Sequence, residues 1–118
     1  MGVMCHHTIV VTGASAEDVA KAHHKATGLF SWVSPISPPF TNGYATFVVP
    51  PDGSKEGWST SNEGDRRRAE FKDWLILHGM CNWVEVAFGA DYHSAKVTAS
   101  NDLPVDADED PAGYGIGG

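Results

Sequence analysis

The sequence predicts a single α+β domain of the ferredoxin-like βαββαβ type: an antiparallel sheet with two helices on one face and an extra C-terminal hairpin strand. Three observations lead to this prediction. The 118-residue chain has the length of one domain, and 42% of its residues are hydrophobic, enough to fill one core. Two segments with helical spacing of apolar residues are interleaved with segments rich in β-branched and aromatic residues. Two of these strand-like segments follow the second helical segment in close succession, which is typical of a hairpin.

The first strand and the first helix are adjacent in the chain. Residues 7–12, HTIVVT, are rich in β-branched side chains and predict a strand that Gly13 ends. Ser15 is a good N-cap, and the acidic residues after it suit the positive end of a helix dipole. The apolar stripe of this helix consists of Val19, Ala22, Ala26 and Leu29. The first helix is therefore predicted over 16–27, with Gly28 as its C′ residue.

A proline-rich segment and a further strand come next. Residues 30–33 are predicted either as an edge strand or as a loop, because three prolines follow directly and proline cannot donate to a ladder. An Asn-Gly turn signal then precedes residues 44–49, which predict the second clear strand. Pro50 and Pro51 end that strand.

The second helix is predicted over 63–77, and Gly79 is expected to stop it. Its apolar face comprises Phe71, Trp74, Leu75 and His78, which have the i, i+3, i+4, i+7 spacing of one helix face. Thr60 and Asn62 are competing N-caps, because each is followed three residues later by an acidic side chain.

The last two strands complete the predicted sheet. Residues 82–88 and 95–99 are expected to pair across a Gly-Ala-Asp turn. If 30–33 is counted as a strand, the first six elements have the βαββαβ order, and the final strand extends the sheet. The helices then cover one face of the sheet and leave the other open to solvent or to a partner. An open face or a free sheet edge also allows a homodimer.

The net charge of −7 is concentrated at the C-terminus. Residues 101–118 carry five acidic side chains and no Lys or Arg, so the domain is predicted over 1–103 and an acidic, glycine-rich disordered tail over 104–118. This tail either solubilises the chain or engages a basic surface. An acidic chain is not expected to bind nucleic acid directly, and no apolar run is long enough for a membrane helix. Because the N-terminus lacks a basic signal-peptide region, an intracellular protein is expected.

Histidines and cysteines are the candidates for metal binding or nucleophilic catalysis. His78 and Cys81 have a spacing that suits a metal clamp if Cys5 or His7 comes near, although His78 also fits a core or boundary position. Neither cysteine has a neighbouring base in a position to activate it, and a disulfide is not expected in a reducing cytosol. No catalytic residue, metal or cofactor is therefore predicted.

Residues 66–68 are three consecutive arginines and form the only basic cluster in the chain. Glu63 lies four residues before Arg67, and Asp65 lies three before Arg68, which is the spacing of helix ion pairs. The simpler interpretation is a solvated helix face that is neutralised by its own acids.

The alternative interpretation is an anion site, because a polar loop leads into a helix N-terminus whose free N–H groups suit phosphate. In this hypothesis Lys55, Trp58, Arg66 and Arg67 hold a nucleotide, and Trp58 stacks on the base. The loop is not a P-loop, because GxxxxGK[ST] is absent. Trp58 is also a candidate anchor for a protein interface.

Three stretches, PDGSKEGW, GDRRRAEFKDWL and NWVEVAFGAD, resemble a group of small proteins encoded by bacteriophages and prophages, for which no activity is established. The similarity covers residues 44–100; it implies a phage origin and the cytoplasm of a bacterial host, and it transfers no catalytic residue. The first hypothesis is a small phage accessory protein that binds a host or defence protein. Inhibition of that protein is one form of this hypothesis. The second is a nucleotide or small-anion binder at residues 54–68. A metal-dependent or cysteine-based enzyme ranks last.

Overall fold

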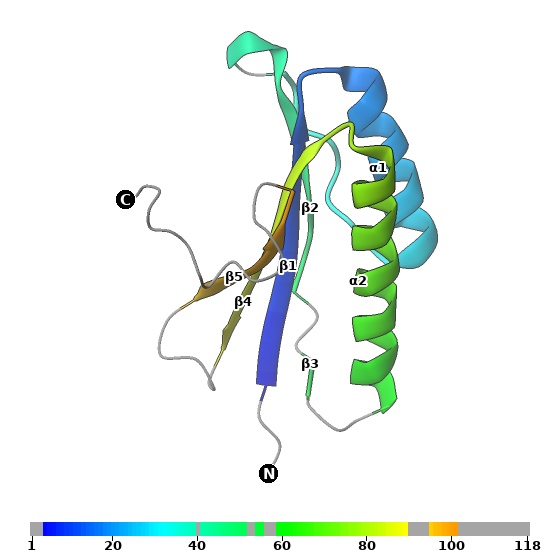
Figure 1. The fold of residues 1–118 in the computed structure, drawn as a ribbon, viewed down its shortest axis with the longest axis vertical. Coiled ribbons are helices and arrows are strands. Elements are labelled where there is room, and N and C mark those ends of the chain that lie inside the picture. The colour runs from blue at the N-terminus through cyan, green and yellow to red at the C-terminus, as the bar shows by residue number, and fades with distance from the viewer. Residues whose placement is uncertain (1–3, 40, 52–53, 56–58, 90–94, 102–118) are drawn as a thin grey trace.

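The protein is an antiparallel sheet with both helices on one of its faces (Figure 1). The computed structural model describes residues 4–39, 41–51, 54–55, 59–89 and 95–101. The elements in chain order are β1 (Met4–Gly13), α1 (Ala16–Leu29), a 3₁₀ turn η1 (Thr41–Gly43), β2 (Ala45–Val49), β3 (Ser54–Lys55), α2 (Ser59–His78), β4 (Asn82–Gly89) and β5 (Lys96–Ser100). The sheet order is β2-β1-β4-β5, and the short β3 pairs with the start of β1. The predicted α+β class is confirmed, whereas the predicted tail at 104–118 lies outside the described residues.

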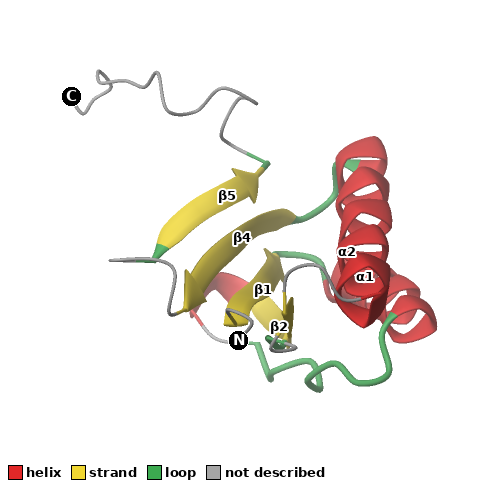
Figure 2. Ribbon diagram, turned by 90° about the horizontal axis from the view of Figure 1, so that it is seen from below, coloured by secondary structure: helices red, strands yellow, loops and turns green. Residues whose placement is uncertain are grey.

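The hydrophobic core lies between the helices and the sheet (Figure 2). Successive side chains of a strand point to opposite faces, so every second residue of β1, β2 and β4 points toward the helices. The largest fully buried side chains are Phe47, Phe71, Ile9, Val11 and Val19. Burial of one such side chain contributes about 1.5–3 kcal/mol, so this layer is the main source of stability.

The start of α1 agrees with the sequence, and its end does not. Ser15 has an extended backbone, and its Oγ accepts a hydrogen bond from the Asp18 N–H at 3.3 Å, as expected of an N-cap. The helix continues through Gly28 to Leu29, so the prediction of Gly28 as the C′ residue is wrong. Leu29 and Phe30 both pack against the core, and this burial favours a further half-turn of helix over an early end.

Residues 30–33, predicted either as an edge strand or as a loop, form no strand; an extended edge without regular strand geometry lies instead at 33–37 and is hydrogen-bonded to β2. The backbone N–H groups of Ser34 and Ser37 donate to the carbonyls of Val48 and Thr46 at 2.9 and 2.8 Å. In return, the N–H groups of Val48 and Thr46 donate to the two serine Oγ atoms at 2.8 and 3.0 Å. Side-chain oxygens thus take the place of backbone carbonyls in this proline-flanked ladder.

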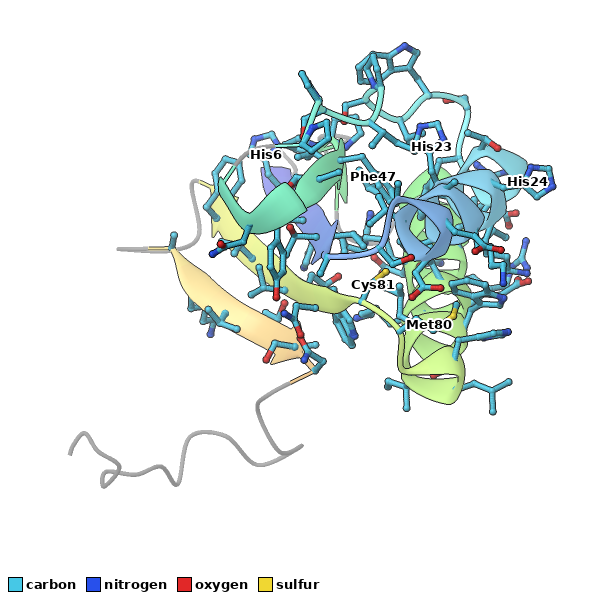
Figure 3. All side chains as sticks on the ribbon, turned by 90° about the horizontal axis from the view of Figure 1, so that it is seen from above. His6, His23, His24, Phe47, Met80 and Cys81 are labelled. Atoms are coloured by element: carbon cyan, nitrogen blue, oxygen red, sulfur yellow. The ribbon has the colours of Figure 1, made fainter. Side chains whose placement is uncertain are left out.

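His23 ties α1 to this edge (Figure 3). Its Nε2 lies 2.9 Å from the Ser34 carbonyl oxygen, so Nε2–H is the donor, and its ring makes an edge-on contact with Phe47 at 5.0 Å between centroids. Replacement His23→Phe is expected to lower the free energy of unfolding by about 1 kcal/mol, because it retains a ring and removes the hydrogen bond. Urea denaturation measures this. The control His24→Phe, at an exposed position of the same helix, should change stability by less than about 0.5 kcal/mol; equal losses would contradict the assigned role.

The start of α2 differs from the prediction by four residues and its end by one. The helix spans Ser59–His78 instead of 63–77, so the predicted N-caps Thr60 and Asn62 both lie inside it. Four consecutive polar residues, 59–62, offer competing starts, and propensity alone does not rank them. Gly79 ends the helix as predicted, with a φ of 62° that suits glycine.

Candidate interaction surfaces

The predicted anion site is only partly described by the structure. The side chains of Lys55 and Trp58 lie outside the described residues, so their roles stay predictions. Arg66 and Arg67 both pair with Glu63, and the Arg67 contact measures 3.3 Å. The pKa of Glu63 lies below its usual 4.5, mainly because Arg66 donates a hydrogen bond to the carboxylate. Glu63 therefore stays ionised at neutral pH and competes with any anionic ligand for the two guanidinium groups.

Arg68 belongs to a different, buried cluster. It pairs with Asp65, as predicted, and its Nε also lies 3.8 Å from an Oε of Glu85. Glu85 accepts hydrogen bonds from Lys72 Nζ at 2.8 Å and from Thr98 Oγ1 at 2.7 Å. Because Glu85 is only 3% exposed, these contacts form a buried polar link between α2, β4 and β5. We call Arg68, Lys72, Glu85 and Thr98 the Glu85 cluster.

Sequence reasoning missed the Glu85 cluster, although one signal for it was present. Trp83 and Ala87 alternate with Glu85 along β4, and all three are buried on the side of the helices. A carboxylate at an inward position of a strand needs a cationic partner, because burial of an unpaired charge is costly. The identity of that partner depends on how α2 crosses the sheet, which the local sequence does not encode.

The strand register separates the candidate metal ligands. His7 pairs with Ala87, whereas Cys81 directly precedes Asn82, which pairs with Thr12 at the other end of the β1–β4 ladder. Five strand residues span about 17 Å, while one zinc ion holds its ligands at about 2.0–2.3 Å. His7 and Cys81 therefore cannot share one ion.

The Cys81 thiol is also poorly suited to chemistry. Burial, and secondly the Asp18 carboxylate, raises the pKa of Cys81 above its usual 9.0, so the thiol stays protonated at neutral pH. Among the residues that the structure describes, no group of three or more His, Cys, Asp or Glu side chains is arranged to hold a metal ion.

The two helices border a groove of about 590 Å³ near the C-terminal end of α2. We call it the helix groove; it is lined by Glu17, Ala20, Lys21, His24, Lys25, Trp74, His78 and Met80. Trp74 and Met80 also pack against the core, as half-buried apolar side chains. Figure 3 labels one residue from each side of it, His24 on α1 and Met80 just after α2. The groove thus combines an apolar part with several nitrogen-bearing side chains.

An aromatic pair lines the α2 side of the helix groove, and an exposed aliphatic side chain lies on the same helix next to this pair in sequence. The rings of Trp74 and His78 stack at 4.0 Å between centroids, and His78 Nδ1 lies 2.9 Å from the Trp74 carbonyl oxygen. Leu77 follows Trp74 at the i+3 position and is 80% exposed. Of these side chains Trp74 is the candidate anchor, because tryptophan is enriched among the residues that dominate binding energy at interfaces.

The charge of the helix groove is opposite to that of the chain. Two lysines and one glutamate give its lining a formal charge of +1 with neutral histidines, whereas the whole chain carries −7. Lys21 pairs with Glu17 at 4.0 Å, and Lys25 pairs with Glu70 at 3.4 Å. Such exposed pairs contribute about 0–1 kcal/mol each, so carboxylates of a ligand can replace them at little cost.

The sheet face opposite the helices forms a second surface. Its described side chains follow from strand alternation and register: His6, Thr8, Val10, Thr12, Thr46, Val48, Asn82, Val84, Val86, Phe88, Val97 and Ser100. None of these is Asp, Glu, Lys or Arg, although such residues make up 19% of the chain. Depletion of charged residues is typical of the buried centre of protein interfaces. We call this surface the open sheet face, because Figure 2 places both helices on the other side.

The described residues thus offer two candidate surfaces on opposite sides of the sheet: the helix groove and the open sheet face. The sequence alone does not predict which residues form either surface, because both surfaces depend on how the helices and strands pack. No described helix is both long and apolar enough to cross a membrane. No family model, no curated protein and no solved structure matches this chain.

Proposed function

We propose that this chain is a non-enzymatic interaction protein whose helix groove binds an acidic segment of a partner protein. The observation that carries this proposal is the groove of about 590 Å³ between α1 and α2, with Trp74 at its apolar part and lysines at its rim. This volume is within the usual range of binding sites, about 300–1,000 Å³.

The lining of the helix groove defines the chemistry of the partner segment. An apolar side chain of the partner packs against Trp74 and Met80, where both side chains are already half-buried. Carboxylates of the partner meet Lys21 and Lys25, whose present ion pairs are exposed and weak. Leu77, 80% exposed and one helical turn after Trp74, offers further apolar area that becomes buried if the partner extends beyond the groove along α2.

The proposed setting is that of a small phage accessory protein in the cytoplasm of a bacterial host, with a host or defence protein as the partner. The resemblance of residues 44–100 to phage-encoded proteins supports this setting. Inhibition of the partner is the simplest consequence of such binding, because a small protein seated on a functional segment blocks access to it.

The proposed architecture is ferredoxin-like. With the extended edge at 33–37 counted as a strand, the sheet order becomes 33–37, β2, β1, β4, β5. Each helix then connects two parallel strands that are separated by one intervening strand, as in a split βαβ unit. The hydrogen bonds of Ser34 and Ser37 to β2 support this assignment, and cross-strand NMR contacts between 33–37 and β2 in solution would test it.

The variant Leu77→Glu tests the proposed function. Leu77 is 80% exposed but lies in the last turn of α2, so the added acid should cost no more than about 1 kcal/mol of stability, while it puts a negative charge beside the proposed acidic segment. In pull-downs from host lysate, capture of the partner should fall at least about tenfold relative to the wild-type chain, which corresponds to about 1.4 kcal/mol.

The matched control for this pull-down is Ala69→Glu, which adds the same charge to an exposed position of α2 about two helical turns before Leu77. It should retain every partner. Full capture by Leu77→Glu would contradict the proposal. A nucleotide bound to the purified chain in native mass spectrometry would instead favour the anion-site hypothesis at residues 54–68.

A further inference from the structure

We propose that two copies of this chain associate through their open sheet faces into a symmetric dimer, with both helix layers on the outside. The inference goes beyond the proposed function and is independent of it, because it uses the face of the sheet opposite the helix groove. Three observations carry it: the charge of the face, its shape and its size.

The distribution of charge favours a second copy as the occupant. Each chain carries a net charge of −7, so two copies repel each other overall. A symmetric contact places a surface against itself, and any acid on it would lie close to another acid. The twelve described side chains of the open sheet face include none that is acidic and no Lys or Arg, so two copies can meet there without like charges in contact.

The two ends of the open sheet face differ in shape. One end is hollowed by about 390 Å³, and the lining consists of Val10, Thr12, Asn82, Trp83, Val84, Val97, Ser100 and Asn101. At the other end of the β1–β4 ladder, the rings of His6 and Phe88 lie against each other with centroids 5.2 Å apart. The midpoint between hollow and ring pair is at Thr8 and Val86, which are paired in register.

The proposed two-fold axis lies between the two sheets and crosses the strands at this midpoint. Rotation about it brings each end of one copy onto the opposite end of the other. It places the ring pair of each copy over the hollow of the other, and it places Val86 against Val86 of the second copy. Each contact then occurs twice, as an isologous interface requires.

The size of the face places the proposed contact among small, reversible interfaces. Eight residues of β4 span about 27 Å and four adjacent strands about 19 Å, so each copy contributes roughly 500 Å². The total of about 1,000 Å² is at the lower limit of specific interfaces. The dimer should therefore be a reversible one with a Kd on the order of micromolar.

Sedimentation equilibrium of the full chain, from about 5 to 500 µM, tests the dimer directly. The wild-type mass should rise with concentration toward twice the 12.6 kDa of one chain. Val86→Lys and Val86→Glu should each remain monomeric over this range, because each sets two like charges against one another across the axis. Ala69→Lys, which adds a charge to the helix layer, should dimerise as the wild type does.

A mixture of the two Val86 variants separates loss of the interface from loss of the fold. The Lys and Glu side chains are then opposite in sign across the axis, so an equimolar mixture should form a 1:1 heterodimer, which native mass spectrometry identifies by mass. Failure of the mixture to associate would overturn the symmetric arrangement. A wild-type chain that stays monomeric at the highest concentration would overturn the dimer. A chain without residues 102–118 that dimerises where the full chain does not would identify the C-terminal segment as the occupant instead.

Discussion

Replacement Glu85→Ala is expected to lower the free energy of unfolding by about 3 kcal/mol or more. Glu85 is buried, and it is hydrogen-bonded to Lys72 and lies within 4 Å of Arg68, which is itself 4% exposed. Its removal takes a buried carboxylate acceptor from Lys72, Arg68 and Thr98 at once, and the loss of one partner of a buried ion pair costs more than the loss of an exposed pair. Urea denaturation at pH 7, followed by circular dichroism, measures the loss.

The control for Glu85→Ala replaces the carboxylate and its two cationic partners together. A triple variant with Arg68→Met, Lys72→Met and Glu85→Leu should be considerably more stable than Glu85→Ala, because apolar side chains of similar volume avoid the cost of desolvating the charges. Lys72→Ala alone should cost less than Glu85→Ala, since the Lys72 side chain is 24% exposed and water replaces part of its contact. A loss below about 1 kcal/mol for Glu85→Ala would show that the cluster is not a structural link.

Replacement Phe71→Ala is expected to cost about 3–5 kcal/mol, by loss of buried area and by the cavity that remains. Phe71 is fully buried, and its ring lies 5.9 Å from that of Phe30 and 6.4 Å from that of Phe47. The matched control on the same helix is Ile76→Ala, because Ile76 is 65% exposed. This replacement should change the free energy of unfolding by less than about 0.5 kcal/mol. Equal losses in urea denaturation would contradict the assigned core.

Local patterns in the sequence predict the elements well. The apolar stripe of α1 is buried at Val19, Ala22 and Ala26, because helical spacing depends only on neighbours three and four residues away. The same reason applies to the ion pairs of α2, where both predicted pairs, Glu63–Arg67 and Asp65–Arg68, are present.

Apart from the start of α2, the features that were missed depend on contacts between distant parts of the chain. The Glu85 cluster joins residues of α2 to β4 and β5, and no local pattern pairs Lys72 with Glu85. The edge at 33–37 uses serine side chains as acceptors for β2, a substitution that strand propensities do not describe. Trp74 packs against the core and also lines the helix groove together with residues of α1. The spacing of apolar residues in the sequence assigns Trp74 only to the buried face of α2.

The two candidate surfaces are compatible with each other because they lie on opposite sides of the sheet. A dimer through the open sheet faces leaves both helix grooves outside, so one dimer presents two equivalent binding sites. Two linked sites raise the overall avidity toward a partner that is itself oligomeric, without any additional contact.

Hydrogen–deuterium exchange of the chain with its captured partner tests the central claim most directly, because it reports which residues the partner covers. Binding in the helix groove predicts added protection in α1 over 17–25 and in α2 over 74–78, and loss of that protection in Leu77→Glu. Protection confined to residues 54–68, or to the open sheet face, with α1 unchanged would contradict the account.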